Sequence, residues 1–592
     1  METPRSEQFD DIYFQIENGL EESRYVFLEK NSLPQRFSGQ DRFTICETGF
    51  GTGLNFLCAW KSFEDVARTG QHLNYISFEK YPLSKDEIAK YLAHWLGEFD
   101  GRLERLVDLY PLRIGGWHKI RVSDFVTLTL IFDDVNRAIP ELDAIVDCWF
   151  LDGHAPAKNP EMWSDTVFSN MGRLSREGAR VATFTAAGIV KRGLEGAGFH
   201  ISKTKGYGRK REMIVGTFEG DRGGDDSVIK PQSVVVIGGG IAGVAVAASL
   251  HSRGVAVDLF EKNGLASGGS GNVRGLFNPR FTAQRGFESD FYSSAFMQAL
   301  RVFQSLDEVG FDPCGSLHLV GDDQKQKRFD GFLGNWDWHQ DHARMVSKEA
   351  AGLISGVPVK HDALYLPDAG MVSPYRVVAA LAKKVSVVAE EVLALQQSDS
   401  QWLVNGRIYD AVVLSCAADV LKFSQTQWLP VHTVRGQVSV INVPDSLEDL
   451  ACNLCYGGYA SHPFDGRMVV GSTFQSWLDD LSIREEDHAD VLSKLSSVVE
   501  GFDGAADISD ARAAFRCSAK DRVPVIGALP EYHGLYVSVA HGSHGLTSSV
   551  LAAEMIAAQM MGESSPVPRH VITNVSAQRF IDRAARKNIS LS

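Results

Sequence analysis

Hydrophobic residues in this chain gather in short runs, and segments of helical periodicity separate the runs. In the first half, runs at 73–80, 128–135 and 142–152 are rich in β-branched and aromatic residues. In the second half, comparable runs at 233–238 and 255–261 flank a strongly apolar segment of small residues. Alternation of strands with helices is typical of mostly parallel sheets. We therefore predict an α/β fold in both halves.

The join between the halves is polar and rich in glycine. Residues 219–231 read EGDRGGDDSVIKP and separate two strand-like runs. This composition is typical of a linker. A chain of 592 residues is also too long for a single hydrophobic core. We predict a first domain at 1–220, a linker at 221–230 and a second domain at 231–592.

Charge and cysteine content limit the classes of partner and compartment. The net charge is -15 and neither half is basic overall, which disfavours general affinity for nucleic acids. A polyanionic partner would have to bind a local basic patch, and 202–211 (SKTKGYGRKR) and 579–587 (RFIDRAARK) are candidates, with solvated surface as the alternative for each. The eight cysteines lack regular spacing, and the N-terminus is acidic without an apolar targeting segment. We expect a soluble cytoplasmic protein.

A glycine turn follows the first strand of the first half. Its glycines are spaced G-x-G-x-G within RFTICETGFGTGLNFLCAW (42–60), unlike the G-x-G-x-x-G of a dinucleotide site. Glu79 ends the second strand, where it can accept hydrogen bonds from a ribose diol, and Asp134 ends the third, where it can meet an adenine amino group. This order resembles the S-adenosylmethionine site of class I methyltransferases; a generic α/β domain with helix-capping acids is the alternative. The residues expected at this cofactor are Glu47, Gly49, Gly51, Gly53, Glu79 and Asp134.

Asp152 ends the fourth strand of this half and precedes the turn-forming stretch GHAPAKNP. Methyl transfer to an amine needs a neutral nitrogen that is aligned with the methyl donor. A carboxylate at the end of a strand can hold an ammonium group and then accept its proton. We predict that Asp152 is catalytic, with helix capping as the alternative. Lys158 is placed either to reach a phosphate or to remain solvated.

The second half opens with a dinucleotide-binding pattern. Gly238, Gly240 and Gly243 have the spacing G-x-G-x-x-G between a strand and a helix of small residues. Glu261 ends the next strand, where an acid binds a ribose hydroxyl. A glycine and serine loop follows at 266–280, suited to wrapping a pyrophosphate or covering a flavin.

FAD is favoured over a nicotinamide cofactor because a second strand, turn and helix follows far along the chain, at 534–562. Backbone N–H groups around Ser543, Gly545 and Leu546 could stabilise negative charge on a reduced flavin. Ordinary glycines at a helix start are the alternative. We expect nucleotide-binding segments at about 232–282, 365–432 and 505–592, interleaved with an antiparallel, β-rich substrate subdomain.

Two further motifs concern the substrate and metals. Arg516 precedes a turn that leads back to the flavin region, so it could hold a carboxylate through two hydrogen bonds; a structural salt bridge is the equal alternative. Cys452 and Cys455 have the C-x-x-C spacing of redox or metal sites. Because no second cysteine pair or histidine cluster accompanies them, we predict ordinary thiols and no metal.

These motifs resemble known families. GGGIAGVAVA with Glu261, VRGQV (434–438), FRCSAKDRVPVIG and HGSHGLTSS are similar to FAD-dependent amine oxidases of the D-amino-acid, glycine and sarcosine oxidase group. With ETGFGTGLNF, FLDGHAPAKNPEMW and the N-terminal stretch around Tyr25 and Leu33-Pro34, the whole chain resembles the bifunctional family that makes 5-methylaminomethyl-2-thiouridine in tRNA. The family more often has phenylalanine at His154, so an aromatic contact there is expected to be altered or sensitive to pH.

The resemblance implies two consecutive reactions on the wobble uridine. The FAD half would remove a carboxymethyl group from 5-carboxymethylaminomethyl-2-thiouridine, and the methyltransferase half would then methylate the freed amine. The implied partner is the anticodon loop of tRNA, with no DNA, membrane or obligatory protein partner, and the base must leave its stack to react. The alternatives are an amino-acid or sarcosine-type oxidase fused to a small-molecule N-methyltransferase, or a tRNA-binding scaffold with relic cofactor sites.

Overall fold

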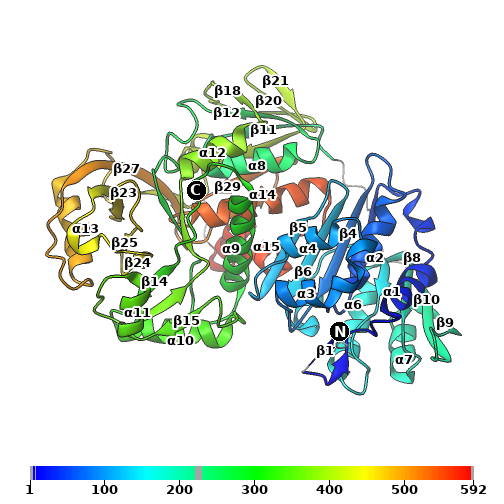
Figure 1. Ribbon diagram of the computed structural model, residues 1–592. Coiled ribbons are helices and arrows are strands. Elements are labelled where there is room, and N and C mark those ends of the chain that lie inside the picture. The colour runs from blue at the N-terminus through cyan, green and yellow to red at the C-terminus, as the bar shows by residue number, and fades with distance from the viewer. Residues whose placement is uncertain (1–3, 7, 221–229, 589–592) are drawn as a thin grey trace. The chain divides into compact units, whose positions relative to one another are not determined.

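The computed structural model of the 592-residue chain describes residues 4–6, 8–220 and 230–588 (Figure 1). The chain divides into two compact units, one made of Met1–Ser227 with Ser564–Arg569, the other of Val228–Glu563 with His570–Ser592. Except for Lys230, the predicted linker lies outside the described residues. A short C-terminal segment, 564–569, thus belongs to the first unit, which the sequence did not indicate.

The first unit is built on a twisted sheet in the order β5-β6-β4-β3-β7-β8-β10-β9. The pairs β3–β4, β4–β6, β3–β7 and β7–β8 are parallel, whereas β5, β9 and β10 pair antiparallel. The strands run outward from β3 in one direction and then from β7 in the other, so the order reverses between β3 and β7. Ligands of open α/β sheets bind at the carboxyl ends of the strands beside such a reversal.

The elements of this unit have the following bounds. Its strands are β1 (Arg5–Ser6), β2 (Asp11–Ile12), β3 (Arg42–Glu47), β4 (His72–Phe78), β5 (Gly116–Arg121), β6 (Val126–Phe132), β7 (Val146–Phe150), β8 (Ser175–Thr183), β9 (Phe199–Lys205) and β10 (Glu212–Phe218). Its α-helices are α1 (Gly19–Ser23), α2 (Leu54–Glu64), α3 (Lys85–Leu92), α4 (Arg102–Leu109), α5 (Val135–Ala138), α6 (Asp165–Leu174) and α7 (Gly188–Gly196).

Alternate residues of the buried strands feed two separate apolar layers. In β3, Ile45 packs with residues of α2, α3, α4 and the N-terminal segment. Its neighbour Cys46 packs on the opposite face with residues of α6 and α7. Successive side chains of a strand point to opposite faces, so a strand that is apolar at every position must be covered on both. The continuous apolar runs of the sequence have this cause.

The second unit contains two larger sheets. The first has the order β18-β12-β11-β22-β29-β28 and is parallel except for β28. Its order also reverses, between β11 and β22, and the helices α8, α9 and α14 pack against one another beside it (Figure 1). The second sheet has the order β15-β16-β14-β24-β25-β26-β23-β27 and is mainly antiparallel.

The bounds in the second unit are these. Its strands are β11 (Ser233–Ile237), β12 (Ala256–Phe260), β13 (Gly275–Phe277), β14 (Ser316–Leu319), β15 (Arg344–Val346), β16 (Ala363–Leu366), β17 (Gly370–Val372), β18 (Ser386–Val388), β19 (Gln396–Ser398), β20 (Gln401–Val404), β21 (Arg407–Tyr409), β22 (Ala411–Leu414), β23 (Val431–Asn442), β24 (Asn453–Cys455), β25 (Tyr459–Ala460), β26 (Arg467–Gly471), β27 (Ile508–Ala519), β28 (Val525–Ala528) and β29 (Leu535–Val539). Its α-helices are α8 (Ile241–His251), α9 (Phe287–Ser305), α10 (Asp323–Asn335), α11 (Lys348–Ser355), α12 (Pro374–Ala382), α13 (Glu485–Ser496), α14 (Gly545–Met561), α15 (Arg569–Val575) and α16 (Gln578–Lys587).

The structure confirms the predicted α/β fold of both halves and the division of the second half between a mostly parallel and a mainly antiparallel sheet. The two sheets of the second unit interleave along the chain as expected. One boundary differs, because β27 falls within the segment 505–592 but pairs with β23 in the second sheet. The β14–β24 pair is parallel, so that sheet is not wholly antiparallel.

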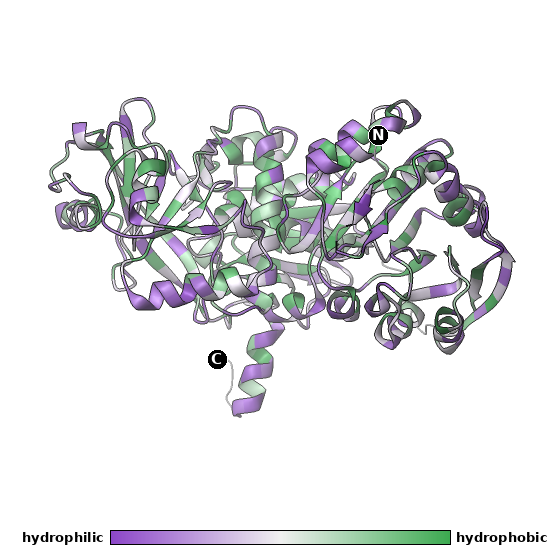
Figure 2. Cartoon of the chain, turned by 60° about the horizontal axis from the view of Figure 1, so that its bottom comes forward, coloured by the Kyte–Doolittle hydropathy of each residue, from purple (hydrophilic) through white to green (hydrophobic). Residues whose placement is uncertain are grey.

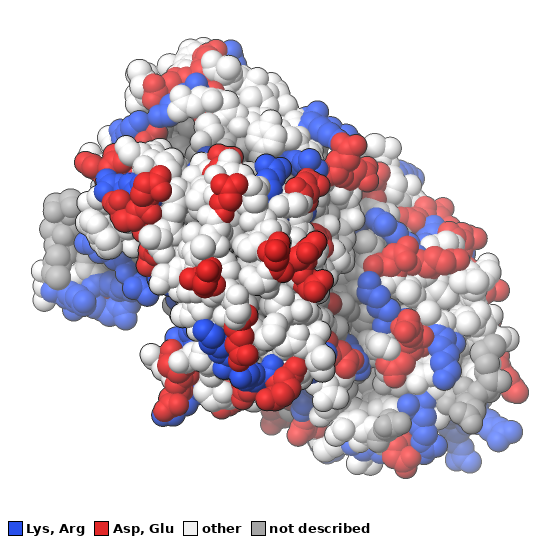
Figure 3. Space-filling model, turned by 60° about the vertical axis from the view of Figure 1, so that its left-hand side comes forward, with Lys and Arg blue, Asp and Glu red and all other residues white. Residues whose placement is uncertain are grey.

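Acidic and basic side chains are mixed on the surface that Figure 3 draws, although the chain as a whole is acidic. The mostly hydrophilic helix α16, which leads to the C label in Figure 2, contains the patch 579–587. Two of its arginines, Arg579 and Arg583, pair with Asp521. Within the described ranges, none of the helices is both long and apolar enough to span a membrane.

Candidate active sites

The first unit has a cavity of about 820 Å³ at the carboxyl ends of β3, β4, β6 and β7. Five of the predicted residues line it: Gly49, Gly51, Glu79, Asp134 and Asp152. Parallel strands deliver their ends to one edge of the sheet, which is why residues far apart in sequence meet here.

Two predicted cofactor residues do not line this cavity. Glu47 is fully buried beneath it and accepts hydrogen bonds from Asn55 Nδ2 at 2.9 Å and Ser77 Oγ at 2.7 Å. Gly53 has a φ of 84° and precedes α2, and a Cβ there would lie 2.7 Å from Phe50 Cζ. Glu47 and Gly53 therefore support the conformation of the glycine turn and would not contact a ligand in the cavity.

Glu79 closes the glycine turn from the neighbouring strand. Its Oε2 accepts a hydrogen bond from Gly51 N at 2.8 Å, and its Oε1 accepts one from Tyr81 N at 2.8 Å. Burial raises the pKa of Glu79, although these backbone N–H groups oppose the rise. Each carboxylate oxygen has two lone pairs, so both can also accept a ribose hydroxyl. Gly51 has a φ of 53°, a backbone conformation that favours glycine. The glycine turn without side chains, together with the Glu79 carboxylate, fits a nucleoside whose ribose lies at Glu79.

Asp134 lies on the same cavity but is already engaged. As the N-cap of α5, it accepts a hydrogen bond from Asn136 N at 2.9 Å. Its other oxygen lies 2.7 Å from Lys80 Nζ. Burial raises the pKa of Asp134, but the contacts with Lys80 and Asn136 outweigh burial, and the net pKa is lowered. Asp134 is therefore a fixed anion, and the helix-capping alternative describes part of its role.

Asp152 has the electrostatic character of a proton acceptor. Its Oδ2 accepts a hydrogen bond from Asn55 Nδ2 at 2.7 Å, and its Oδ1 accepts one from Gly153 N at 2.8 Å. Burial raises its pKa from 3.8 to about 6. Burial and the Asp152 charge also raise the pKa of Glu47, and Asn55 Nδ2 donates a hydrogen bond to each of the two carboxyl groups. A base with a pKa slightly below neutrality is ionised at pH 7 and still accepts a proton readily.

The N-terminal segment also lines this cavity, which the sequence reasoning missed. The His154 ring packs against Phe9, with ring centroids 4.6 Å apart, and against Tyr13 at 5.8 Å. Burial lowers the His154 pKa, although Asp11, at 3.6 Å from Nδ1, opposes this. His154 thus keeps an aromatic packing role. Lys158 remains solvated, with a side chain that is 42% exposed, and it donates a hydrogen bond to the backbone oxygen of Asp10 at 2.6 Å.

The second unit has a cavity of about 1250 Å³ along the carboxyl ends of β11, β12 and β22. Six predicted residues line it: Gly238, Gly240, Glu261, Ser543, Gly545 and Leu546. Arg516 lines it as well. The loop at 266–280 contributes Ser267 to Ser270 and Asn272.

The glycines of the second unit have separate structural tasks. A Cβ on Gly238, whose φ is 117°, would lie 2.6 Å from the Ser415 oxygen of the neighbouring strand end. A Cβ on Gly243 would lie 1.8 Å from Gly238 O, so Gly243 permits helix α8 to approach β11. Gly243 does not line the cavity, and its effect on a ligand is indirect. Glu261 accepts hydrogen bonds from Gly239 N at 2.7 Å and Asn263 N at 2.8 Å.

Several polar groups in this cavity fit a flavin dinucleotide. Among the described residues, Ser415 Oγ and Ser549 Oγ are buried without a hydrogen-bond partner, and both residues line the cavity. Helix α14 begins at Gly545, so its first backbone N–H groups have no acceptor within the helix. Burial lowers the pKa of both His541 and His544 to about 4, which keeps these rings uncharged. An anionic ligand ring would therefore meet helix N–H groups and neutral imidazoles.

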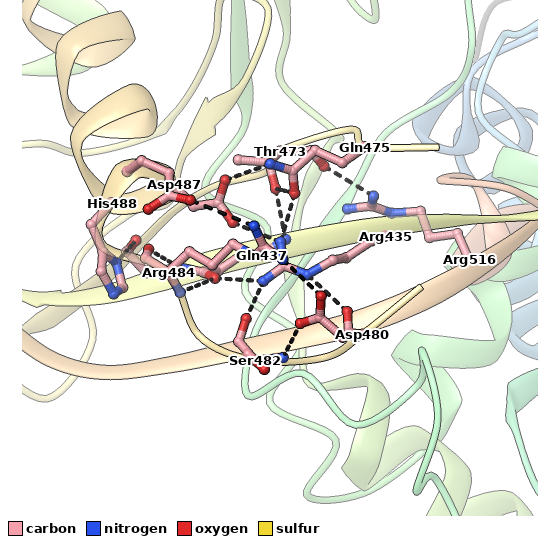
Figure 4. Close-up of polar contacts among 12 residues, drawn as sticks. Arg435, Gln437, Thr473, Gln475, Asp480, Ser482, Arg484, Asp487, His488 and Arg516 are labelled. Atoms are coloured by element: carbon pink, nitrogen blue, oxygen red, sulfur yellow. Dashed lines mark hydrogen bonds and ion pairs between the residues drawn. The ribbon is translucent and has the colours of Figure 1, made fainter. Parts of the chain in front are cut away.

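Arg516 lies on β27 and is one of the basic residues that line this cavity, and in Figure 4 its side chain lies beside Thr473 and Gln475. Its guanidinium donates to Thr473 O at 3.2 Å and Ser472 Oγ at 2.6 Å, and it lies 4.6 Å from the centre of the Phe474 ring. A Cβ on Gly436 would lie 2.1 Å from Arg516 NH1, so the strand opposite is bare where the side chain crosses. No acid pairs with Arg516 among the described residues, which argues against the salt-bridge alternative. Burial lowers its pKa, so an incoming carboxylate would stabilise its charge.

A fully buried ion pair holds the segment that positions Arg516 (Figure 4). Arg435 donates to Asp487 Oδ2 at 2.6 Å and to Gln475 Oε1 at 2.6 Å. Gln475 in turn donates to Asp487 Oδ1 at 2.7 Å. These bonds fix residues 472–475, whose backbone and Ser472 hydroxyl accept the Arg516 hydrogen bonds. Sequence reasoning missed this network, although Arg435 stands in the VRGQV motif.

The C-x-x-C pair and one group of possible metal ligands both lie in the second unit. Cys452 and Cys455 are free and buried, and burial raises the pKa of Cys455 to about 12. In the described part of the chain, one group of possible metal ligands occurs, Asp312, Cys314 and His462, with ligand atoms within 4.8 Å of one another. Asp312 Oδ2 and His462 Nδ1 lie 3.1 Å apart as a pair. None of the three lines either cavity.

Comparison with protein families identifies both halves. Residues 233–559 match the family described as FAD dependent oxidoreductase. Residues 97–219 match S-adenosyl-L-methionine-dependent methyltransferase, a stretch that includes Asp134 and Asp152 but not the glycine turn.

Relatives extend the likeness over the whole chain. The tRNA 5-methylaminomethyl-2-thiouridine biosynthesis bifunctional protein MnmC of Methylobacillus flagellatus is 37% identical over 617 residues, covering 98% of this chain and 95% of that protein. The protein of the same name from Chromobacterium violaceum is 35% identical over 636 residues, covering 98% and 96%. Among solved structures, L-proline dehydrogenase from P. horikoshii covers 60% of this chain and 99% of its own, with 18% identity and a TM-score of 0.52. Glycine oxidase from Geobacillus kaustophilus covers 58% and 98%, with 21% identity and a TM-score of 0.50. These two structures share the fold of the second half.

Proposed function

We propose a function from the premise that this chain belongs to the family of bifunctional tRNA 5-methylaminomethyl-2-thiouridine biosynthesis proteins, MnmC. The chain is an enzyme with two active sites that act in turn on the wobble uridine of tRNA. The FAD half converts 5-carboxymethylaminomethyl-2-thiouridine to 5-aminomethyl-2-thiouridine. The methyltransferase half converts that product to 5-methylaminomethyl-2-thiouridine. A cytoplasmic location follows from a tRNA substrate.

In the FAD half, Arg516 binds the carboxylate of the substrate's N-substituted glycine group. FAD, when bound, would supply the two-electron oxidation of the methylene next to the nitrogen, and water would then release the two-carbon fragment as glyoxylate and leave the amine. Gly238, Gly240 and Glu261 would hold the nucleotide part, and the backbone N–H groups at the start of α14 would be available to the flavin ring. A carboxylate bound at Arg516 would fix the methylene in one orientation, and such positioning lowers the barrier to the transfer.

In the methyltransferase half, Asp152 orients the primary amine and takes its proton. Bound S-adenosylmethionine supplies the methyl group, with its ribose at Glu79 and its methionine part against Gly49 and Gly51. The ammonium group would lose one proton to the Asp152 carboxylate. The freed lone pair would then form the new N–C bond as the S–CH3 bond breaks, and S-adenosylhomocysteine would leave. Because burial raises the Asp152 pKa to about 6, the carboxylate can receive this proton at neutral pH.

One observation carries the proposal. Each cavity contains a charged side chain that is complementary to one substrate group: Arg516 for a carboxylate in the FAD half and Asp152 for an ammonium group in the other. The freed amine of the first reaction is the group that the second cavity is charged to receive. A single nucleotide that loses a carboxymethyl group and gains a methyl group accounts for both cavities.

The test is nucleoside mass spectrometry on tRNA from cells that lack this gene, incubated with the purified full chain. Without S-adenosylmethionine, we expect carboxymethylaminomethyl-uridine to fall and aminomethyl-uridine to appear. With S-adenosylmethionine, methylaminomethyl-uridine should appear instead. Unchanged uridines together with oxidation of free glycine or sarcosine would replace this function with the small-molecule alternative. A colourless protein that does not bind S-adenosylmethionine would favour a scaffold.

A further inference from the structure

A lysine of the chain itself occupies part of the methyltransferase cavity. Lys210, on the loop between β9 and β10, has its Nζ 2.8 Å from Glu22 Oε1. The same Nζ lies 4.7 Å from the centre of the Phe184 ring. Lys210, Glu22, Phe184 and Asp152 all line the cavity. A carboxylate on one side and an aromatic face on the other is an arrangement that binds an organic ammonium group.

The position of Phe184 relative to Asp152 follows from strand register. The parallel strands β7 and β8 pair Phe150 with Ala182. Asp152 and Phe184 each stand two residues beyond that pair, so they leave the sheet at the same level. Glu22 approaches from α1, in the N-terminal segment that also lines the cavity. Glu22 and Phe184, from two separate elements, therefore meet at the ammonium group of Lys210.

We propose that Glu22 and Phe184 form the subsite for the primary ammonium group of the methyl acceptor, and that Lys210 fills this subsite until the acceptor enters. The inference rests on the proposed function. An aminomethyl group and the end of a lysine side chain share the same chemistry, a methylene that carries –NH3+. The Lys210 side chain is 48% exposed, so it can leave without disturbing the core.

The chain offers a matched control in the same hairpin. Lys203 pairs with Glu212 at 2.6 Å across β9 and β10. This pair is similarly exposed, and neither residue lines the cavity. If Lys210 and Glu22 form only a surface ion pair, changes at the two pairs should have the same small effect. If they occupy a ligand subsite, only changes at Lys210 and Glu22 should alter ligand affinity.

The experiment measures binding of free 5-aminomethyl-2-thiouridine nucleoside to the full chain by calorimetry, with S-adenosylhomocysteine bound. The nucleoside has no phosphate, so contacts between Lys210 and tRNA phosphates do not contribute. The variants are Lys210→Met, Glu22→Gln, the double variant, and Lys203→Met as the control. The affinity for S-adenosylhomocysteine reports whether each variant keeps its fold.

Lys210→Met removes the internal competitor and should tighten nucleoside binding by about three- to tenfold, the range for one exposed ion pair with a cation–π contact. Glu22→Gln should weaken binding by a similar factor, and the double variant should bind as weakly as Glu22→Gln alone. Lys203→Met should bind like the wild type. Unchanged or weaker binding by Lys210→Met, undetectable binding by it, or unchanged binding by Glu22→Gln would overturn the subsite. A wild type that binds S-adenosylmethionine but never methylates the tRNA would instead refute the proposed function.

Discussion

Replacing Asp152 with asparagine removes a buried negative charge from the methyltransferase cavity and keeps the size of the side chain. Burial raises the Asp152 pKa from 3.8 to about 6. At about 1.4 kcal/mol per pKa unit, the ionised carboxylate costs the folded state about 3 kcal/mol. Asparagine has one acceptor oxygen, so it can keep the bond from Gly153 N but must present its NH2 group to Asn55 Nδ2, which costs about 1 kcal/mol. The free energy of unfolding should rise by about 2 kcal/mol at pH 7.

The stability advantage of Asp152→Asn over the wild type should decrease as the pH falls. Between pH 3.8 and pH 6 the folded state binds a proton that the unfolded state lacks, so the penalty on the wild type shrinks as the pH falls. The advantage of Asp152→Asn should therefore drop below about 1 kcal/mol at pH 5. Methyl transfer by the wild type should fall about tenfold per pH unit below pH 6, and the variant should lose about 10²- to 10⁴-fold in rate.

Scanning calorimetry and single-turnover methylation from pH 5 to pH 8 test this reasoning together. The methyltransferase transition is identified by its shift with S-adenosylhomocysteine and should move up by about 4–8 °C in the variant at pH 7. Asp143→Asn, at an exposed aspartate before the same strand, is the control and should change neither property. A variant that is inactive yet less stable than the wild type at pH 7 would refute the claim that burial destabilises the carboxylate. A variant that keeps a tenth of the rate would refute the catalytic role.

Three further changes test the second unit. Gly243→Ala places a Cβ 1.8 Å from Gly238 O, so the purified variant should carry markedly less flavin by absorbance, and normal flavin content would contradict the packing argument. Arg516→Met should raise the KM for carboxymethylaminomethyl tRNA by about 10- to 100-fold and leave methylation of aminomethyl tRNA unchanged, whereas an effect on both reactions would point to misfolding. Arg435→Met leaves Asp487 buried without its partner and should lower the free energy of unfolding by about 3–5 kcal/mol in urea with excess FAD. A loss below 1 kcal/mol would mean that water or local rearrangement replaces the pair.

Sequence analysis placed at the cavity those residues that directly follow a recognisable strand. Glu79 and Asp152 follow apolar strands, and parallel strands bring their ends to one edge. Glu22 and Phe184 could not be predicted this way. The N-terminal segment has no regular periodicity that indicates where it packs, and the position of Phe184 depends on the register between β7 and β8. Glu47 shows that the order of strand ends can also mislead. It is an acid at the end of a strand, yet it is buried below the cavity and does not line it.

The burial of Arg435 and its pairing with a distant acid could not be predicted from the sequence either. A charged residue inside an apolar strand pattern is ordinarily read as a surface position, yet Arg435 is fully buried. Its partner Asp487 lies on α13, about fifty residues along the chain, and sequence spacing alone does not pair a strand residue with a distant helix. A buried guanidinium persists only where several acceptors surround it, and here these include Gln475 and backbone oxygens.

The proposed roles of Arg516, Asp152 and Glu22 would also order the two reactions by charge. Before the first reaction, the substituent on the uridine carries a carboxylate beside its secondary ammonium group, and Glu22 and Asp152 would repel that carboxylate from the methyltransferase cavity. After it, the substituent carries a primary ammonium group and no carboxylate, so those same acids would attract it and Arg516 would repel it from the FAD cavity. Methylation of the carboxymethylated nitrogen and renewed oxidation of the freed amine would therefore both be disfavoured. Under this proposal neither site needs to recognise the other, because removal of the carboxylate would reverse the preference of the substituent for the two cavities.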